Sequence, residues 1–334
     1  MKKCIKFLWA IFLILFAFIV FFVAVHQLLT IIEKRQHPTI GTTVTVNGKH
    51  MSLSILGDGD HTIVLLPGLG TAAPILDFMP LATELSKTNR VVIVEPFGYG
   101  WSDITNDERT LENEVEEIRS ALTEANINGP YVLMPHSISG LHAIYYANTY
   151  PDDYPDEIEG IIGIDCTLPT MVDYFNEETP AKMLPLMGQL ANLGVMRLIS
   201  LIQPDNFTSD NTSQYYSEKN LDMQRMIAGW KADNKNVIDE LNHIDDSICK
   251  TKNMTFSPEL PLLFFTQDDS GQNPREDGKT SVSFYETYIT NSSIQEVIPL
   301  DGSHYLHWSC KEEIVSYTNQ FVNYSVNSSL HRLQ

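Results

Sequence analysis

Short continuous apolar runs alternate with longer amphipathic segments along most of this 334-residue chain. Runs without interior polar residues are typical of strands covered on both faces, and helices between them make the connections of a parallel sheet. We therefore predict an α/β fold with a mostly parallel central sheet flanked by helices. The expected strands are 62–66, 91–95, 131–134, 160–165, 262–265 and 294–300, and the expected helices are 75–85, 111–125, 141–148 and 311–324.

An antiparallel hairpin is predicted ahead of the first parallel strand. Residues 43–46 alternate Thr and Val, Asn47 and Gly48 follow, and the alternation resumes over residues 51–55. An Asn-Gly pair between two alternating runs is a strong hairpin signal, because both positions of the turn favour residues that tolerate positive φ.

The helix expected over 111–125 has one apolar stripe at helical spacing, which we expect to be buried. The stripe consists of Leu111, Val115, Ile118 and Leu122. A cluster of acidic residues lies between these positions, and we expect it to form the solvated face of the helix. The cluster consists of Glu112, Glu114, Glu116 and Glu117.

The N-terminal segment has the composition of a membrane-spanning helix. Residues 7–25 contain no charged or strongly polar side chain, and apolar residues continue to position 32. About 20 apolar residues span a hydrocarbon core as a helix. Three lysines precede the run, so we expect a cytoplasmic N-terminus and the remainder of the chain outside. Residues 1–35 would then form a cytoplasmic tip and a transmembrane signal anchor. The alternative, a cleaved signal peptide, fits less well because the run is long and no Ala-x-Ala site follows it.

The stretch around Ser137 has the order of a strand, a sharp turn and a helix. An apolar run through Met134 precedes residues 135–140, which read Pro-His-Ser-Ile-Ser-Gly, and a helical stretch follows. Such a turn holds a serine in a strained conformation, so that its hydroxyl projects clear of the chain. Ser137 is therefore the candidate nucleophile, although Pro135 and Ser139 replace the glycines of the usual Gly-x-Ser-x-Gly pattern. The alternative is a serine-rich helix N-cap.

Three further segments occur with this turn in an order and spacing that resemble the α/β-hydrolase superfamily. They are Pro67-Gly68-Leu69-Gly70, Gly98-Tyr99-Gly100-Trp101-Ser102 and Gly302-Ser303-His304. They are similar to the family's oxyanion loop, its Gly-x-Gly-x-Ser turn and its late catalytic histidine. The resemblance covers roughly residues 42–325 and implies an α/β-hydrolase fold.

The resemblance also implies a catalytic triad, with Ser137 as the nucleophile and His304 as the general base. His307 is the other nearby candidate for the base. Asp165 is the first candidate for the orienting acid, and Asp269 is the alternative. Asp165 ends the strand that follows the elbow helix, and Asp269 comes shortly after the next strand.

The oxyanion hole implied by the resemblance consists of the backbone N–H groups of Leu69 and Ile138. Because the hydrogen bonds come from backbone donors, Pro67 in place of the family's histidine does not remove the hole.

Two other histidines lie nearby. We expect His136 to belong to the elbow or the pocket wall, and His142 to be packed inside the fold.

The alternation of strands and helices stops between residues 168 and 258, where helical patterns occur without a clear strand. An insertion at this point looks like the superfamily's helical cap, placed between two parts of a core formed by residues 36–167 and 259–334. Residues 183–202 are rich in Met and Leu. We expect this stripe to fill the core of the cap, and the alternatives are that it lines an acyl pocket or touches a membrane.

Charge and motif content narrow the partners and cofactors. The net charge is −20, and removing residues 1–35 leaves 17 basic and 41 acidic residues, or −24. Such a body repels nucleic acid, so no nucleic-acid partner is expected. No phosphate loop, dinucleotide fingerprint or Cys/His metal spacing is present, so no cofactor and no metal are expected. The body has three cysteines, which allow one disulfide at most.

The sequence thus leads to a membrane-anchored serine hydrolase that faces outward and cleaves an ester or related acyl bond. A carboxylesterase or lipase-like enzyme acting on a small-molecule or lipid-like acyl substrate is the first expectation. The same constellation serves thioesterases, amidases and serine aminopeptidases, and the fold does not choose between them. A surface binding protein without catalysis is the alternative from another class.

Overall fold

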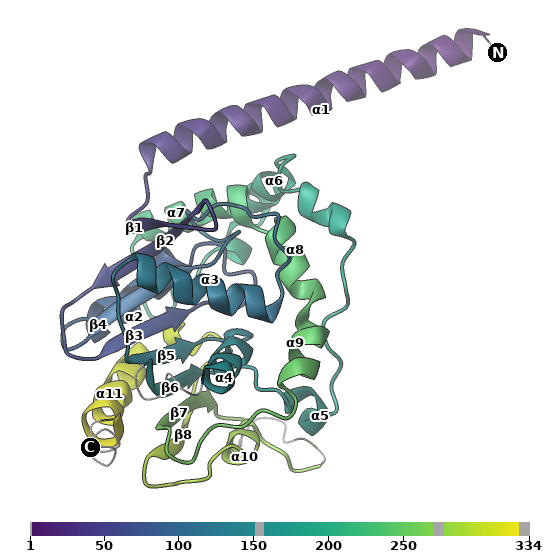
Figure 1. Cartoon of the computed structure of the whole chain (residues 1–334). Helices are drawn as coiled ribbons and strands as arrows, with labels where there is room; N and C mark the ends of the chain where they lie inside the picture. The colour runs from purple at the N-terminus through teal and green to yellow at the C-terminus, as the bar shows by residue number, and fades with distance from the viewer. Residues whose placement is uncertain (1, 151–156, 270–274, 276, 327–334) are drawn as a thin grey trace.

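The computed structural model describes residues 2–150, 157–269, 275 and 277–326. Its centre is an eight-stranded sheet in the order β1-β2-β4-β3-β5-β6-β7-β8 (Figure 1). β2 runs antiparallel to β1 and β4, and the remaining neighbours are parallel, so the predicted sheet and its leading hairpin are confirmed. The strands are β1 (Thr42–Val46), β2 (Lys49–Leu56), β3 (Thr62–Leu66), β4 (Arg90–Glu95), β5 (Tyr131–Pro135), β6 (Ile158–Ile164), β7 (Leu262–Gln267) and β8 (Gln295–Leu300).

Helices cover both faces of the sheet. One face packs against α3 (Leu111–Glu124), α4 (Ser139–Thr149) and α10 (Ser281–Glu286). The other face packs against α2 (Pro74–Leu85) and α11 (Lys311–Phe321), which is followed by a π-helical turn over Val322–Val326. The strands alternate between these two apolar clusters, as the pleat requires, and burial on both faces explains their continuous apolar sequences.

The apolar stripe of α3 is buried as predicted, but its acidic face is only partly solvated. Glu114 and Glu117 are 5% and 2% exposed, whereas Glu116 is exposed. Arg109, itself buried, donates from Nη1 and Nη2 to Glu117 and lies 3.3 Å from Glu114 through Nε. The prediction of a fully solvated acidic face was therefore wrong, because a single arginine ahead of the helix pairs with two of its carboxylates inside the fold.

The segment between β6 and β7 contains helices and no strand over residues 168–258, all of which are described. In Figure 1 the helices α6 and α7 lie next to the N-terminal helix, and α8 and α9 continue down the right side of the body towards α5. The helical elements are α5 (Met171–Phe175), η2 (Pro185–Gln189), α6 (Val195–Ile202), η3 (Pro204–Phe207), α7 (Glu218–Lys231), α8 (Lys235–Asn242) and α9 (Ile244–Thr251). We refer to residues 168–258 as the cap segment.

The Met/Leu stripe of the cap segment does not fill a core, contrary to our expectation. Most of its large side chains are exposed: Met183, Leu184, Leu186, Met187, Leu193, Leu198, Leu201 and Ile202. The reason is that α6 is a short helix that packs with one face only. Met196 and Ser200, one turn apart, are buried, and the leucines between and beyond them point away from the body.

The N-terminal helix α1 (Lys2–Gln36) is 35 residues long and projects beyond the body of the molecule (Figure 1). Its most apolar window has a mean hydropathy of 3.1, and none of that window is buried inside the molecule. By length and composition it is able to cross a membrane or to act as a signal sequence. The four cysteines are all free thiols.

Candidate active site

The turn between β5 and α4 places Ser137 at the carboxyl edge of the sheet. Ser137 has a φ of 53°, a left-handed conformation that is strained for a residue with a side chain. Backbone hydrogen bonds fix it there: the N–H of Ser137 donates to Ile164 O at 3.3 Å, and the N–H of Thr167 donates to Ser137 O at 2.7 Å. The strained turn is thus held from the end of the neighbouring strand β6.

The structure accommodates the two residues that replace the usual glycines. Pro135 is the last residue of β5, and the ladder to β3 continues beyond it through the N–H of His136, which donates to Leu66 O. The Ser139 hydroxyl donates to Pro67 O at 2.5 Å and so joins the elbow to the loop after β3. The position where the start of α4 comes closest to the chain after β6 is Gly140, one residue later, since a Cβ there would lie 2.3 Å from Thr167 O.

Ser137, His304 and Asp165 form one hydrogen-bonded line. His304 Nδ1 lies 2.7 Å from Asp165 Oδ2, and His304 Nε2 lies 2.8 Å from Ser137 Oγ. A carboxylate only accepts, so His304 donates from Nδ1, and in the neutral ring Nε2 is left to accept the proton of the serine hydroxyl. Ser137 lies in the elbow after β5, His304 in the loop after β8, and Asp165 at the end of β6.

The two candidate acids have different partners. Asp165 lies against His304 and also accepts a hydrogen bond from Gln267 Nε2 at 2.8 Å. Asp269 instead accepts from the backbone N–H and the hydroxyl of Ser281, at 2.8 and 3.0 Å, at the start of α10. Gln267 was not foreseen in the sequence. Its position at the end of β7, next to the end of β6, is the only signal that would have suggested it.

The loop after β3 packs tightly against the elbow. A Cβ on Gly68 would lie 2.8 Å from His136 Nδ1 and 2.9 Å from the Ser137 Cβ. Only a glycine allows this approach. In the described part of the chain, no acceptor is paired with the backbone N–H of Leu69 or of Ile138. Two backbone donors beside the serine are therefore free to bind a ligand oxygen.

His307, the second candidate base, is directed away from Ser137. Its Nε2 lies 2.9 Å from Asp77 Oδ2, and the ring is fully buried. Asp77 also accepts hydrogen bonds from Trp308 Nε1 and the Ser209 hydroxyl. Burial alone would raise the pKa of Asp77, but the ion pair with His307 and these hydrogen bonds lower it. This second His–Asp pair joins the loop after β8 to α2 and the cap segment.

His136 lies between the His307–Asp77 pair and the hydrogen-bonded residues Ser137, His304 and Asp165. Burial, followed by the neighbouring His307 and His304, holds the pKa of His136 well below its ordinary value, so the ring is neutral. Its Nε2 lies 3.1 Å from His304 O and donates there, because a carbonyl only accepts. His136 thus supports the backbone of His304. His142 is buried and contacts Glu114 through Nε2 at 3.0 Å.

A tyrosine links the cap segment to the loop after β3. The hydroxyl of Tyr99 accepts from Gly70 N at 3.2 Å and donates to Glu240 Oε2, on α8, at 2.5 Å. Burial first, and Glu114 second, raise the pKa of Glu240 well above its ordinary value. The position of α8 is therefore coupled to the loop that carries Leu69.

Two cavities of about 330 Å³ each flank this arrangement. The first lies between the cap segment and the core and touches Gly70, Met196, Phe207 and Tyr305. The second touches Asp165 and His304, together with Phe175, Arg275 and Tyr285. We call them the cap cavity and the histidine cavity.

Comparisons with known proteins place the chain among distant relatives. No protein-family profile matches it. It is 28% identical over 292 residues to the uncharacterized protein YbdG of Bacillus subtilis (strain 168), covering 84% of this chain and 85% of that protein. It is 34% identical over 127 residues to the serine hydrolase BPHL of Mus musculus, covering 34% of this chain and 41% of that protein.

Solved structures with the same architecture include the enol-lactonase of Burkholderia xenovorans LB400, with a TM-score of 0.58 and 15% identity. That match covers 84% of this chain and all of the lactonase chain. A serine hydrolase involved in carbazole degradation matches with a TM-score of 0.55 and 14% identity, over 85% of this chain and 98% of the other. Together with the sheet order, these likenesses show that the chain has the α/β-hydrolase fold.

Proposed function

We propose that this protein is a membrane-anchored serine hydrolase that cleaves an ester or related acyl bond through an acyl-enzyme intermediate. The observation that carries the proposal is the line from Asp165 Oδ2 to His304 at 2.7 Å and from His304 to Ser137 Oγ at 2.8 Å. These distances lie within the hydrogen-bond reach that a nucleophile, its base and an orienting acid need.

In the proposed mechanism, His304 Nε2 takes the proton of the Ser137 hydroxyl as its oxygen attacks the acyl carbon. Asp165 holds the ring by accepting from Nδ1 and stabilises the imidazolium that forms. The backbone N–H groups of Leu69 and Ile138 bind the oxyanion of the tetrahedral intermediate. His304 then gives its proton to the leaving alcohol, and a water molecule, deprotonated by the same nitrogen, hydrolyses the acyl-enzyme.

The partners of the two carboxylates support Asp165 as the acid over Asp269. The serine at position 137 supports acyl transfer over epoxide or haloalkane hydrolysis, for which the superfamily uses an aspartate in the elbow. The likeness to a mouse serine hydrolase agrees with this chemistry. We propose α1 as an uncleaved signal anchor with its N-terminus in the cytoplasm, supported by the lysines before the apolar run.

Carboxylesterase or lipase-like activity is the first choice of bond type, because an apolar cap surface and the proposed anchor suit an enzyme that acts at a membrane on an acyl substrate. Thioesters and aminoacyl amides are the alternatives with the same catalytic groups, and a non-catalytic binding protein is the alternative without them.

The test is labelling of the full chain in detergent with a fluorophosphonate probe, which reacts with an activated serine. We expect the wild type to be labelled, Ser137→Ala to be unlabelled, and Ser316→Ala, at an exposed serine of α11, to keep its label. A panel of esters, thioesters and amides graded by acyl length then identifies the bond. A folded wild type that stays unlabelled would overturn the proposal in favour of a binding protein.

A further inference from the structure

Exposed apolar side chains are concentrated in one part of the cap segment. Among the described residues outside α1, eight of the twelve exposed large hydrophobic side chains lie between Met183 and Ile202. Leu184, Leu186, Leu201 and Ile202 are each 70–76% exposed. Scattered surface leucines are ordinary, but a concentration of this kind on a soluble face marks a surface that binds an apolar partner.

The same part of the cap segment holds the N-terminal helix. Arg197 of α6 donates to both Glu33 oxygens at 2.6 Å and to Thr30 Oγ1 at 3.1 Å. Gln27 Nε2 donates to Asn192 O at 2.8 Å. These contacts use one polar stripe of α1, so the polar residues near the end of the apolar run are all turned to the cap segment.

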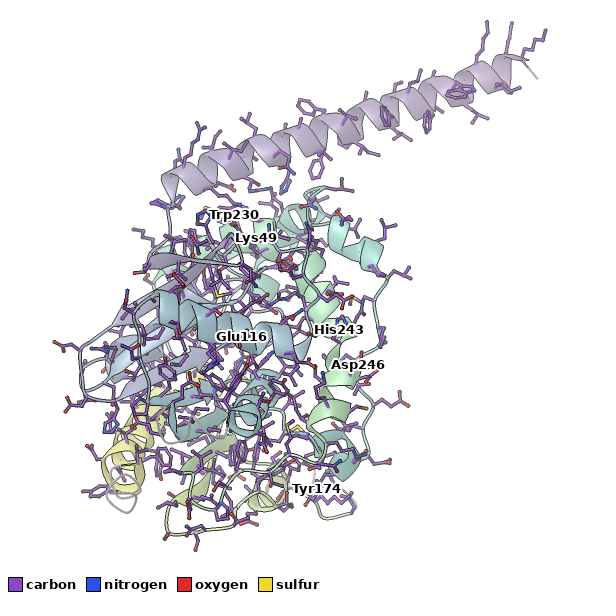
Figure 2. The ribbon with its side chains drawn as sticks, viewed as in Figure 1. Lys49, Glu116, Tyr174, Trp230, His243 and Asp246 are labelled. Atoms are coloured by element: carbon purple, nitrogen blue, oxygen red, sulfur yellow. The ribbon has the colours of Figure 1, made fainter. Side chains whose placement is uncertain are left out.

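Trp230 of α7 completes this contact by donating from Nε1 to Glu33 Oε2 at 2.6 Å. Figure 2 shows Trp230 beneath the C-terminal end of α1. The other sides of α1 remain apolar and uncovered there, because Leu28, Leu29, Ile31 and Ile32 are all exposed. The apolar surface of α1 thus continues alongside the cap segment and does not stop before it.

We propose that residues 183–202 form a membrane-contacting surface that lies in the outer interface of the same bilayer that α1 spans. This inference rests on the proposed membrane anchor. The stretch of α1 without polar side chains ends at residue 25, and the next two residues already contact the cap segment, His26 through Arg197 and Gln27 through Asn192. Since a helix rises 1.5 Å per residue, the exposed leucines of α6 lie within about one or two helical turns of the hydrocarbon boundary.

The side chains of this surface are suited to contact neutral lipids by inserting apolar groups between them. The body outside residues 1–35 carries a net charge of −24, which repels anionic headgroups. A basic patch is therefore not what holds this face to a membrane. Leucines that enter the boundary between headgroups and acyl chains need no charge complementarity.

The position of α6 connects this surface to the proposed active site. Leu198, Leu201 and Ile202 are exposed, whereas Met196 on the same helix is buried and lines the cap cavity. Phe207, a few residues beyond α6, lines the same cavity, whose far wall includes Gly70 of the loop beside Ser137. The substrate class that this arrangement favours is an amphiphile that reaches the cap cavity from the bilayer, since the cavity wall combines apolar Met196 and Phe207 with polar residues such as Gln224.

The experiment uses the full chain in phosphatidylcholine vesicles, with Cys4→Ser and Cys249→Ser as the background because these two thiols are exposed. Single cysteines are introduced as Leu201→Cys on the cap surface, Leu15→Cys in α1 and Tyr324→Cys on the opposite side of the body. Each is labelled with a fluorophore, and quenching by a phosphatidylcholine spin-labelled near the top of its acyl chain is compared with quenching by aqueous iodide.

We expect the probe at Leu201→Cys to lose about half of its fluorescence to the lipid quencher, because interfacial apolar faces lie roughly 5–10 Å deep. Leu15→Cys should also respond to the lipid quencher, and Tyr324→Cys only to iodide. If Leu15→Cys responds and Leu201→Cys does not, the membrane-contacting surface is overturned while the anchor stands. If Leu201→Cys is shielded from both quenchers, a second protein copy covers the surface, which also overturns the proposal.

A lack of response at Leu15→Cys would remove the anchor and the surface together, and fluorophosphonate labelling of Ser137 reports on the chemistry independently. The substrate class has its own readout. The double variant Leu201→Ser/Ile202→Ser should hydrolyse an ester embedded in vesicles about tenfold more slowly, yet hydrolyse a water-soluble short-chain ester at the wild-type rate, because only access from lipid is changed. An equal loss of rate on both substrates would contradict the proposed entry of substrate from the bilayer.

Discussion

Arg197 of α6 holds Glu33 of α1 in a bidentate ion pair, with Nη1–Oε1 and Nη2–Oε2 distances that are both 2.6 Å. The two side chains are only 14% and 20% exposed. A paired geometry of this kind is stronger and more directional than a contact with lysine. It fixes the end of the N-terminal helix to the cap segment.

Removing this pair should loosen the contact between α1 and the cap segment. Gln27→Cys and Asn192→Cys, introduced together without Cys4 and Cys249, should be joined by a short bismaleimide cross-linker, since the Gln27 side chain reaches Asn192 O at 2.8 Å in the wild type. We expect Arg197→Met to slow this cross-link about tenfold or more, because close charge pairs couple by ~1.5 kcal/mol or more.

The matched control for that experiment is Arg225→Met. Arg225 pairs with Asp222 on the same cap segment, but the pair is 30% and 71% exposed and does not touch α1. It should leave the cross-linking rate unchanged. An equal effect of both substitutions would mean that the cap segment is destabilised in general and that the pair has no special role.

The two candidate acids should respond differently to loss of charge. Asp165→Asn should lower kcat by about 10³- to 10⁴-fold, because the amide no longer orients His304 or stabilises its charged form. Asp269→Asn should change kcat only a few-fold, since Asp269 bonds to Ser281. The rate of fluorophosphonate labelling measures the effect of each substitution. If Asp269→Asn had the larger effect, the roles of the two residues would be exchanged.

Gly68 should be the most sensitive glycine of the loop after β3. In Gly68→Ala, the new Cβ would meet His136 Nδ1 at 2.8 Å and the Ser137 Cβ at 2.9 Å. The loop must then shift away from the elbow, and misplacement by about 1 Å costs on the order of 10²-fold in rate. We therefore expect kcat/KM to fall by about that factor with little change in far-UV circular dichroism.

Gly70→Ala is the matched control in the same loop. Gly70 has a φ of 78°, but a Cβ there would meet nothing within 4 Å. We expect about 1 kcal/mol of destabilisation from backbone strain and a smaller effect on kcat/KM. If the two alanine variants lost activity equally, loop strain and not proximity to the elbow would be the cause.

Lys231 should make stability depend on pH above neutrality. Burial first, and repulsion from Lys34 second, lower its pKa to about 7 in the folded chain. An exposed lysine in the unfolded chain titrates near 10.4. Between these values the unfolded state binds more protons, so the free energy of unfolding rises with pH, by up to about 1.4 kcal/mol per pH unit.

Lys231→Met should flatten that rise between pH 7.5 and pH 9. The free energy of unfolding, measured by chemical denaturation in detergent, should then differ from that of the wild type by on the order of a few kcal/mol over this range. Glu95, whose pKa burial raises to about 7, differs in charge between the two states mainly below this pH window. Lys219→Met, at an exposed position on the same helix, should keep the wild-type slope. A slope unchanged by Lys231→Met would show that the amine stays protonated.

The sheet was predictable from the sequence because each strand is buried on both faces and so carries a continuous apolar run. The same local logic predicted the turn at Ser137, which joins a strand to a helix. The sequence put Asp165 before Asp269 as the candidate acid but could not separate the two by position, because both follow ends of neighbouring strands. Their partners depend on where the loop with His304 and the start of α10 lie in space.

The predictions that were wrong concern side chains whose burial depends on distant partners. Glu114 and Glu117 lie among exposed residues of α3 in the sequence, yet Arg109 draws both into the fold. Conversely, apolar residues of 183–202 have the composition of a core, but most of their large side chains are exposed. Periodicity shows which residues share a face, and it does not show what lies opposite that face.

The ion pair between Arg197 and Glu33 has a mechanical consequence. The N-terminal helix is held by the cap segment, and it joins the sheet only through the short stretch between Gln36 and Thr42. If α1 spans a bilayer as we propose, and if the cap segment and the sheet separate to admit a substrate, the cap segment keeps its position relative to the bilayer and the sheet moves. Opening would then tilt the sheet and the helices that cover it, so its amplitude would depend on the space around the protein.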